Sequence, residues 1–190
     1  MYNVGSEDWD EKYTKLVKDR KESQSKPYIV LTPEWASEIE EKIQNDQRYK
    51  EVAKTWEGSV TLVFKADSAS GLDADLFVFM DLWHGQCHSA KIVPGEIGRS
   101  ADYVLEATYQ RWKRVLKKDL NVVREIATNK LKLVPFNFKK AAKLAAAAQA
   151  AIRLVDLAGE VSDKFPDDLE PEASLAFKAF LQELKTDFSI

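Results

Sequence analysis

The first quarter of the chain carries apolar residues three or four positions apart, with polar residues between them. This spacing predicts a helix over residues 6–24. Thr32 and Pro33 then mark the start of a second helix, because threonine caps helix starts and proline suits the first helical position. Apolar residues continue at helical spacing, so we expect helix over residues 33–54.

Alternation with a period of two follows and predicts strands at residues 59–66, 74–83 and 87–93. Gly85-Gln86 matches the pair favoured in a type II′ hairpin turn between the second and third strands. This turn places four side chains on one side: Phe77, Phe79, Trp83 and Ile92. It places four others on the opposite side: Val78, Met80, Leu82 and Val93. Both sides are apolar, so more than one helical layer should cover the sheet, and a ligand is one candidate cover.

The second half of the chain mixes short strands and helices. We expect a strand over residues 103–105, a helix over 109–117, a further helix capped by Asp119, and a strand over 130–134. Together with the three strands and two helices before them, these elements indicate an α+β fold.

The remaining residues predict two longer helices. Asn137 caps a helix that runs to Leu157 and that Gly159 ends. An acidic, proline-bearing linker, residues 163–171, leads to a last helix over about residues 172–186. Its apolar stripe consists of Ala173, Phe177, Phe180, Leu181, Leu184 and Phe188. This stripe has to be buried on something, and the linker leaves the helix free to hinge.

The charge balance excludes one class of partner. The chain has 28 Lys and Arg against 31 Asp and Glu, a formal net charge of -3, so we expect no nucleic-acid partner. The single cysteine, Cys87, excludes an internal disulfide and favours a reducing compartment, which makes the cytoplasm the expected location. Residues 1–8 do not resemble a signal peptide, and the alanine-rich stretch 141–158 contains charges that a membrane span would lack.

Side chains with metal-ligand chemistry gather near the predicted hairpin, at Asp81, His84, Cys87 and His88. A zinc site needs three or four converging ligands, and the predicted hairpin sends Cys87 and His88 to opposite faces. No glycine-rich elbow accompanies Cys87, so it does not resemble a nucleophile. We therefore expect no metal site, no cofactor and no catalytic residue, and the chain is not predicted to be an enzyme.

Two surface features leave alternatives open. A basic helix face is formed by Arg111, Lys113, Arg114, Lys117 and Lys118. It is either a solvated outer face or a site of transient contact with anionic headgroups or with acyl-CoA phosphates. The alanine run over residues 145–151 normally lets another element pack closely, and a homodimer through it is the alternative.

Several local motifs occur in a characteristic order: Thr32-Pro33-Glu34-Trp35, Asn45, Tyr49, Trp56-Glu57-Gly58, Ala101-Asp102-Tyr103-Val104-Leu105, Trp112 and Lys130-Leu131-Lys132-Leu133. With the alanine-rich helix that follows, this order resembles the prokaryotic branch of the sterol carrier protein family. The resemblance spans about residues 32–160. The chain departs from the family in its extension over residues 1–31 and in Pro135-Phe136, where many relatives have glycine.

The resemblance implies a five-stranded, mainly antiparallel sheet covered on one side by helices, with an apolar tunnel between them. It implies non-catalytic binding and carriage of a fatty acyl chain, acyl-CoA, phospholipid or sterol-like lipid. The expected organisation is a helical extension (1–31), a lipid-binding domain (32–160), and an acidic linker with a helix that packs on the same domain (161–190).

We expect apolar side chains from the strands, the helix pair and the last helix to line the ligand space, with the last helix covering the tunnel as a lid. The candidate ligand-binding residues are Phe77, Phe79, Trp83, Leu105, Trp112, Val115, Leu116, Ile126, Phe177, Phe180 and Leu184. Two alternatives remain open. One is a structural or oligomerisation module with a filled core, and the other is an accessory domain that presents an acyl or aromatic substrate to a partner enzyme.

Overall fold

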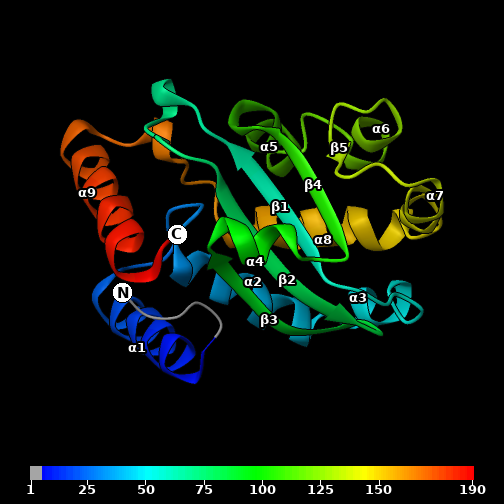
Figure 1. Cartoon of the computed structure of the whole chain (residues 1–190), viewed down its shortest axis with the longest axis horizontal. Coiled ribbons are helices and arrows are strands. Elements are labelled where there is room, and N and C mark those ends of the chain that lie inside the picture. The colour runs from blue at the N-terminus through cyan, green and yellow to red at the C-terminus, as the bar shows by residue number, and fades with distance from the viewer. Residues whose placement is uncertain (1–5) are drawn as a thin grey trace.

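The computed structural model describes residues 6–190 as an α+β fold (Figure 1). The helices are α1 (Glu7–Ser23), α2 (Pro33–Asn45), α3 (Gln47–Val52), α4 (Gly95–Arg99), α5 (Tyr109–Leu116), α6 (Val122–Ala127), α7 (Phe138–Ala146), α8 (Ala148–Val161) and α9 (Pro171–Phe188). The strands are β1 (Val60–Lys65), β2 (Leu76–Trp83), β3 (Gln86–Val93), β4 (Tyr103–Thr108) and β5 (Lys132–Leu133). Two 3-10 turns, η1 (Ser68–Ser70) and η2 (Pro166–Asp168), complete the order.

The five strands form one sheet in the order β3-β2-β1-β4-β5. Neighbouring strands run antiparallel except for β1 and β4, which run parallel. This arrangement confirms the predicted α+β class with a mainly antiparallel five-stranded sheet. The parallel pair is possible because the chain between β1 and β4 passes through the β2–β3 hairpin and α4, which supply the crossover that parallel strands need.

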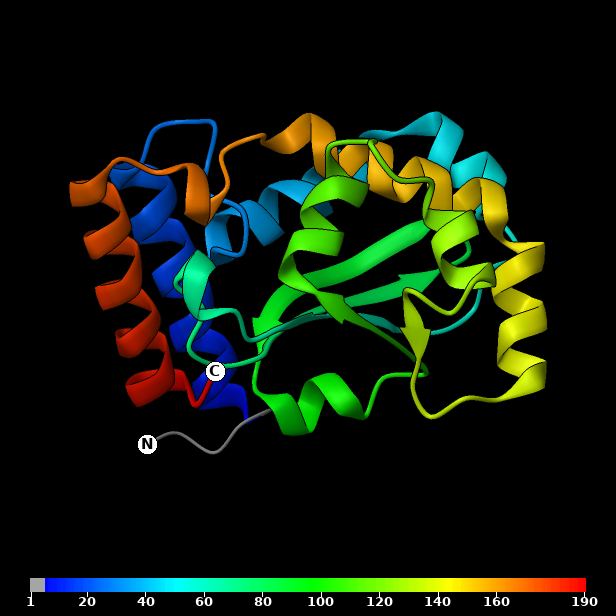
Figure 2. The same cartoon turned by 90° about the horizontal axis from the view of Figure 1, so that it is seen from above.

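One face of the sheet carries the main helical layer, formed by α2, α3, α5 and α8 (Figure 2). Strand positions two apart point to the same face, so Val78, Met80 and Leu82 of β2 all face these helices. Their side chains belong to a large buried cluster with Trp35 and Trp112 from α2 and α5. The core therefore lies between the sheet and this layer.

The opposite face of the sheet is covered by protein as well. A second buried cluster joins Val63, Phe77 and Val104 of the sheet to Trp9 of α1 and Leu184 of α9. Helix α4 also lies on this side, in residues that the sequence predicts as a loop (Figure 2). The second apolar face thus packs against side chains of the chain itself, so it does not need the ligand that the sequence analysis offered as a cover.

The β2–β3 hairpin turns one residue earlier than predicted. His84 and Gly85, with φ values of 47° and 76°, occupy the turn, as a type I′ hairpin requires, and Trp83 pairs with Gln86. The register also shifts once between Asp81 and Leu82. As a result Ile92 lies opposite Val78 rather than on the side of Phe77, so its predicted side is wrong. A shift of one residue exchanges the two faces of a strand.

The predicted helix over 33–54 is interrupted at Asp46, which ends α2 and caps α3. The Asp46 side chain accepts a hydrogen bond of 2.5 Å from the Tyr49 amide and pairs with Arg153 of α8, also at 2.5 Å. The Arg153 hydrogen bond is the main reason why the pKa of Asp46 lies below its usual range. One carboxylate therefore fixes both a helix boundary and the position of α8.

The predicted long helix is divided in two at Ala147, where the backbone has φ -91° and ψ 19°. Helix α8 then continues through Gly159 to Val161, so the prediction that Gly159 ends the helix is wrong. A Cβ at Gly159 would lie 2.6 Å from the Leu116 carbonyl oxygen. This glycine lets α8 approach α5 closely instead of stopping a helix. The cap of α6 is likewise Asn121, two residues after the predicted Asp119.

Candidate functional site

A cavity of about 70 Å³ lies between the sheet and the main helical layer. The sheet and the short helices contribute Trp35, Ile39, Tyr49, Trp56, Val60, Leu62, Val78, Met80, Leu82, Leu105, Trp112, Leu116, Val122 and Ile126. Helices α7 and α8 and the break between them contribute Leu144, Ala147, Ala150, Ala151, Leu154, Val155 and Ala158. None of these lining residues carries a charge. The wall is thus suited to an apolar ligand.

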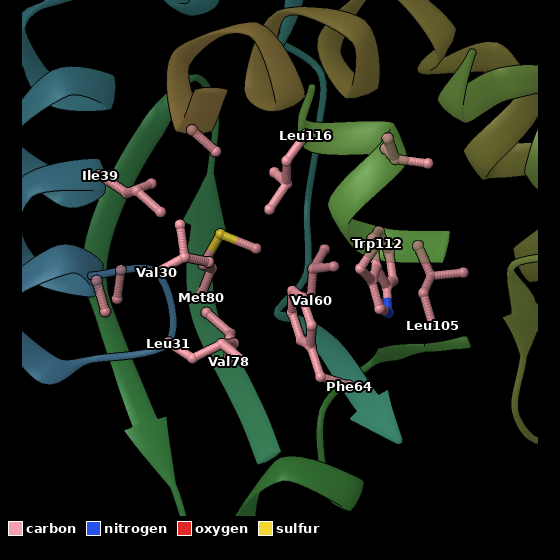
Figure 3. Packing of buried hydrophobic residues seen from close by; sticks show 14 of the residues in the cluster. Val30, Leu31, Ile39, Val60, Phe64, Val78, Met80, Leu105, Trp112 and Leu116 are labelled. Atoms are coloured by element: carbon pink, nitrogen blue, oxygen red, sulfur yellow. The ribbon is translucent and has the colours of Figure 1, made fainter. Parts of the chain in front are cut away.

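The floor of the cavity follows from strand periodicity. Val60 and Leu62 of β1 point to the same face as Met80 and Val78 of β2, their partners across the antiparallel ladder. Leu105 of β4 lies beside Leu62 in the parallel ladder. Figure 3 shows Met80 and Leu116 reaching toward each other from the sheet and from α5. Three strands therefore form a continuous aliphatic surface.

The roof is made by α5 and α8. Trp112 and Leu116, four residues apart on α5, point toward the sheet, and the Trp112 indole Nε1 donates a hydrogen bond of 2.9 Å to the Val63 carbonyl oxygen. Ala150 and Ala151 of α8 supply small side chains above the floor. Small side chains leave open space there that larger ones would fill.

Four lining residues carry a polar group, namely Trp35, Tyr49, Trp56 and Trp112, and the indoles of Trp56 and Trp112 donate to backbone carbonyl oxygens. Trp35 is 1% exposed, and its indole N–H has no hydrogen-bond partner within residues 6–190. Burial raises the pKa of the Tyr49 hydroxyl, so this group stays protonated at neutral pH. A buried donor without a partner is uncommon, because buried indole N–H groups usually find an acceptor.

A larger pocket of about 580 Å³ adjoins the cavity. It lies among α6, β5 and α7 and is lined by Val123, Ile126, Ala127, Asn129, Lys132, Leu133, Val134, Phe136, Ala141, Leu144, Ala145 and Ala151. Ile126, Leu144 and Ala151 line both spaces. These three side chains therefore form a boundary between the surface pocket and the cavity.

Several predicted ligand-binding residues lie at this site. Leu105, Trp112, Leu116 and Ile126 line the cavity. Val115 is fully buried in the main core cluster but does not line the cavity. Helical spacing thus placed Trp112 and Leu116 on the side of α5 that faces the cavity.

The three predicted residues of β2 lie elsewhere. Phe77 belongs to the second cluster, and a Cβ at Gly98 of α4 would lie 2.6 Å from its ring. Phe79 packs against the same cluster, and Trp83 is 47% exposed at the end of the hairpin. The structure therefore places these residues away from the cavity. The β2 residues that do line it, Val78, Met80 and Leu82, were assigned to the other side of the predicted strand.

The three predicted residues of α9 also lie away from the cavity. Phe180 and Leu184 pack with α1 in the second cluster, and Phe177 joins the edge of the main cluster. The guanidinium of Arg20 lies 3.6 Å from the centre of the Phe180 ring, and the Trp9 indole donates to the Phe188 carbonyl at 3.1 Å. Figure 1 shows α9 beside α1 at one end of the molecule. The predicted lid position is thus wrong.

The basic face of α5 is largely neutralised by neighbouring acids. Arg111 pairs with the buried Glu125, and Lys113 lies 2.8 Å from Asp167 and 2.6 Å from Asp168. Further pairs join Lys117 to Asp168 at 3.6 Å and Lys118 to Asp156 at 3.1 Å. Arg114 stays exposed. These pairs position α5 against the segment before α9 and leave little free charge for a membrane contact.

The residues with metal-ligand chemistry are dispersed. His84 lies 3.0 Å from Glu57 and His88 lies 3.5 Å from Asp81, both at the surface. Cys87 is buried, and burial raises the pKa of its thiol. Within residues 6–190 no three His, Cys, Asp or Glu side chains gather as a metal site would require. No helix of this part of the chain is long and apolar enough to cross a membrane.

The sequence reasoning missed the residues that α2 and α8 contribute to the cavity. Trp35 and Ile39 are spaced four apart on α2, and Ala151 and Val155 are spaced four apart on α8. Their helical spacing signals burial, but burial against a cavity and burial against other side chains produce the same pattern. The alternation in β1 likewise predicted that Leu62 is buried, but it did not show whether Leu62 faces a cavity or other side chains.

Neither a family model nor a curated protein sequence matches the chain. A crystal structure of sterol carrier protein 2 matches with a TM-score of 0.64 and 37% identity, over 70% of this chain and 99% of that one. The chain belongs to the sterol carrier protein family. A second similar structure, a conserved hypothetical protein of Thermus thermophilus described as a possible sterol carrier protein, has a TM-score of 0.63 and 37% identity. That match covers 70% of this chain and 90% of the other.

The match agrees with the sequence-based resemblance to the sterol carrier protein family. Since 99% of sterol carrier protein 2 is covered, nearly a whole family member is contained in this chain. The cavity between sheet and helices thus lies in a fold that this family shares.

Proposed function

We propose that the protein binds a long apolar ligand and carries it without chemical change. The observation that supports this proposal most is the cavity wall, which has 21 lining residues and no charged group. A charged acid, base or nucleophile would be needed inside the pocket for most catalysis, and this wall supplies none. Membership of the sterol carrier protein family supports the same function.

The ligand occupies both spaces in this proposal. Sites for small molecules measure about 300–1,000 Å³, whereas the cavity alone measures about 70 Å³. The adjoining pocket of about 580 Å³ falls in the usual range. A ligand that enters between α6 and α7 and extends past Ile126 and Ala151 would reach the inner wall at Leu105 and Trp112.

The preferred ligand carries an apolar chain and an oxygen acceptor. Long acyl chains supply the apolar part, and each methylene removed from water contributes about 0.8 kcal/mol. The Trp35 N–H supplies a donor for a carboxyl, ester or hydroxyl oxygen. Fatty acids, acyl-CoA, phospholipids and sterol-like lipids all meet this description. We assign this binding to residues 32–160, and we place the protein in the cytoplasm, where the single cysteine stays a thiol.

The test is binding of a fluorescent fatty acid to the full chain and to two matched variants. Ala151→Leu adds bulk where the pocket meets the cavity, whereas Ala142→Leu adds the same bulk on an exposed position of α7. We expect Ala151→Leu to weaken binding about tenfold or more, since about 1.4 kcal/mol of lost contact is tenfold, and Ala142→Leu to bind as the parent does. Absence of saturable binding by the parent chain would refute carriage.

A further inference from the structure

The segment from Ile126 to Val155 has a charge pattern unlike that of the whole chain. It contains five lysines, one arginine and no Asp or Glu, so its formal charge is +6. The full chain, with 28 basic and 31 acidic residues, has a charge of -3. This segment includes β5, α7 and most of α8. A positive region of this size on an acidic protein creates a strongly asymmetric surface potential.

The lysines at this end of the molecule are free of acidic partners. Lys130, Lys132, Lys139 and Lys143 are exposed and form no ion pair within residues 6–190. The Lys140 ammonium donates a hydrogen bond to the Asp102 carbonyl oxygen, which leaves its charge uncompensated. On α5 and in the two residues after it, by contrast, four of the five basic side chains are held in ion pairs with Glu125, Asp156, Asp167 and Asp168.

Two exposed aromatic rings lie among these lysines. Phe136 is 60% exposed and Phe138 is 84% exposed, and their rings meet edge to face with centroids 4.9 Å apart. Burial of such rings is worth more than that of most side chains, so their exposure signals an interaction surface. Aromatic residues next to lysines are typical of elements that lie in the interface of a membrane.

Helix α7 is weakly attached to the rest of the protein. Leu144 is the buried residue of this helix, and the break at Ala147 separates α7 from α8. Phe136, Ala141 and Leu144 also border the surface pocket of about 580 Å³. Figure 1 shows α7 at the end of the molecule remote from α1 and α9. Lys132 and Phe136 thus line the pocket itself, and Phe138, Lys139 and Lys143 lie on α7, which also borders it.

We propose that this surface, which we call the α7 surface and define as Lys130, Lys132, Phe136, Phe138, Lys139 and Lys143, docks on an anionic lipid bilayer. The two rings insert among the acyl chains, and the lysines contact the phosphate and carboxylate groups of the headgroups. Each lysine near such a surface raises the partition about fivefold. The proposal rests on the proposed function, because docking in this orientation brings the pocket to a source of lipid ligand.

The experiment measures co-sedimentation of the full chain with vesicles of phosphatidylcholine alone and of equimolar phosphatidylcholine and phosphatidylserine. We expect at least about tenfold stronger partition into the anionic vesicles, and a steep loss of binding as salt is added. Phe136→Ser with Phe138→Ser, and separately Lys139→Glu with Lys143→Glu, should each lower that partition about tenfold or more. All four positions are exposed, so the variants should melt like the parent.

Control variants make the corresponding substitutions, apolar to serine and lysine to glutamate, at the opposite end of the molecule. Leu175→Ser removes an exposed apolar residue of α9, which is 69% exposed, and Lys15→Glu with Lys18→Glu reverses two exposed lysines of α1. Both controls should partition within about twofold of the parent, roughly 0.4 kcal/mol. Equal binding to both vesicle types, no binding at all, or unchanged partition of the α7 variants would overturn the proposal.

Two further measurements separate this proposal from its alternatives. Binding of a fluorescent fatty acid in solution should be the same for the parent and for Lys139→Glu with Lys143→Glu, because neither lysine lines the cavity or the pocket. A failure of docking and a failure of carriage are thereby distinguished. Sedimentation velocity without vesicles tests whether the α7 surface binds a second copy of the chain instead of a bilayer. A dimer that Phe136→Ser with Phe138→Ser abolishes would refute membrane docking, whereas a monomer supports it.

Discussion

The Trp112 indole donates a hydrogen bond of 2.9 Å to the carbonyl oxygen of Val63. This contact joins α5, which forms the roof of the cavity, to β1, which forms part of its floor. The Val63 side chain points to the opposite face and belongs to the second cluster. This hydrogen bond therefore attaches α5 to a residue of β1 whose side chain packs in the second cluster.

Replacement of Trp112 by Phe should remove this bond and keep most of the ring packing. The free energy of unfolding should fall by about 1–3 kcal/mol, because the buried Val63 carbonyl loses its partner and the smaller ring leaves a cavity. Chemical denaturation measures the change. Trp83→Phe, at an exposed position, is the matched control and should change stability by less than about 0.5 kcal/mol. Equal stability of the two variants would contradict the assigned role.

Affinity for fatty acids should rise with chain length. Each methylene that reaches the apolar wall contributes about 0.8 kcal/mol, which is about fourfold in the dissociation constant. Competition of a series of saturated fatty acids against one fluorescent analogue measures this slope. The slope should level off when the chain exceeds the combined cavity and pocket. Binding that saturates but does not depend on chain length would argue against an apolar site.

Trp35→Phe should separate the contribution of the Trp35 hydrogen bond to ligand affinity from the contribution of apolar contacts. If the free Trp35 N–H donates to a ligand oxygen, this change should weaken fatty acid binding about five- to tenfold, or about 1 kcal/mol. Binding of a hydrocarbon of the same length should change little. The comparison variant is Trp56→Phe, because the Trp56 indole already donates to the Gly58 carbonyl at 2.8 Å. An equal effect on both ligands would exclude the proposed hydrogen bond.

Asp167 should make part of the stability dependent on pH. Burial by itself raises the pKa of this carboxyl, but hydrogen bonds from Lys113, Tyr109 and Gln110 outweigh burial and hold the pKa below its usual range. A lowered folded pKa stabilises the protein above the unfolded pKa of about 3.9, and this stability is lost as pH falls through the folded value.

Asp167→Asn should therefore lower the free energy of unfolding by about 1–2 kcal/mol at neutral pH. The difference from the parent should begin to shrink below the unfolded pKa of about 3.9 and be lost below the lowered folded pKa, where the carboxyl of the folded parent is also neutral. Urea denaturation at neutral and acid pH measures both values. Asp163→Asn, at an exposed position of the same linker, is the control. A difference that stays constant across this pH range would contradict the assigned ion pairs.

The fold class could be predicted because its signals are local. Thr32-Pro33 starts α2 where expected, since a cap and a fixed φ act within one turn. The alternation of Val60, Leu62 and Phe64 gives β1. Helical spacing on α5 placed Trp112 and Leu116 on the buried side, and both line the cavity. The sequence by itself therefore determined most of the elements, their order and the inner face of α5, but not α4.

The tertiary structure decided which face of β2 meets the cavity. Both faces of this strand are apolar, and the turn at His84-Gly85 differs from the predicted turn by one residue. A one-residue shift moves Ile92 across the sheet, and composition does not reveal it. The choice between Phe77 and Val78 as a cavity residue was made by α4 and the α1–α9 pair, which cover Phe77 from distant parts of the chain.

The tertiary structure also decided where the alanine-rich segment breaks and where α9 packs. Alanine favours helix at every position from 145 to 148, so no local signal predicts the break at Ala147. The apolar stripe of α9 required a partner, but the stripe could not specify α1 as that partner. Apolar burial is non-directional, so the shape of the assembled surfaces selects which stripe packs on which face.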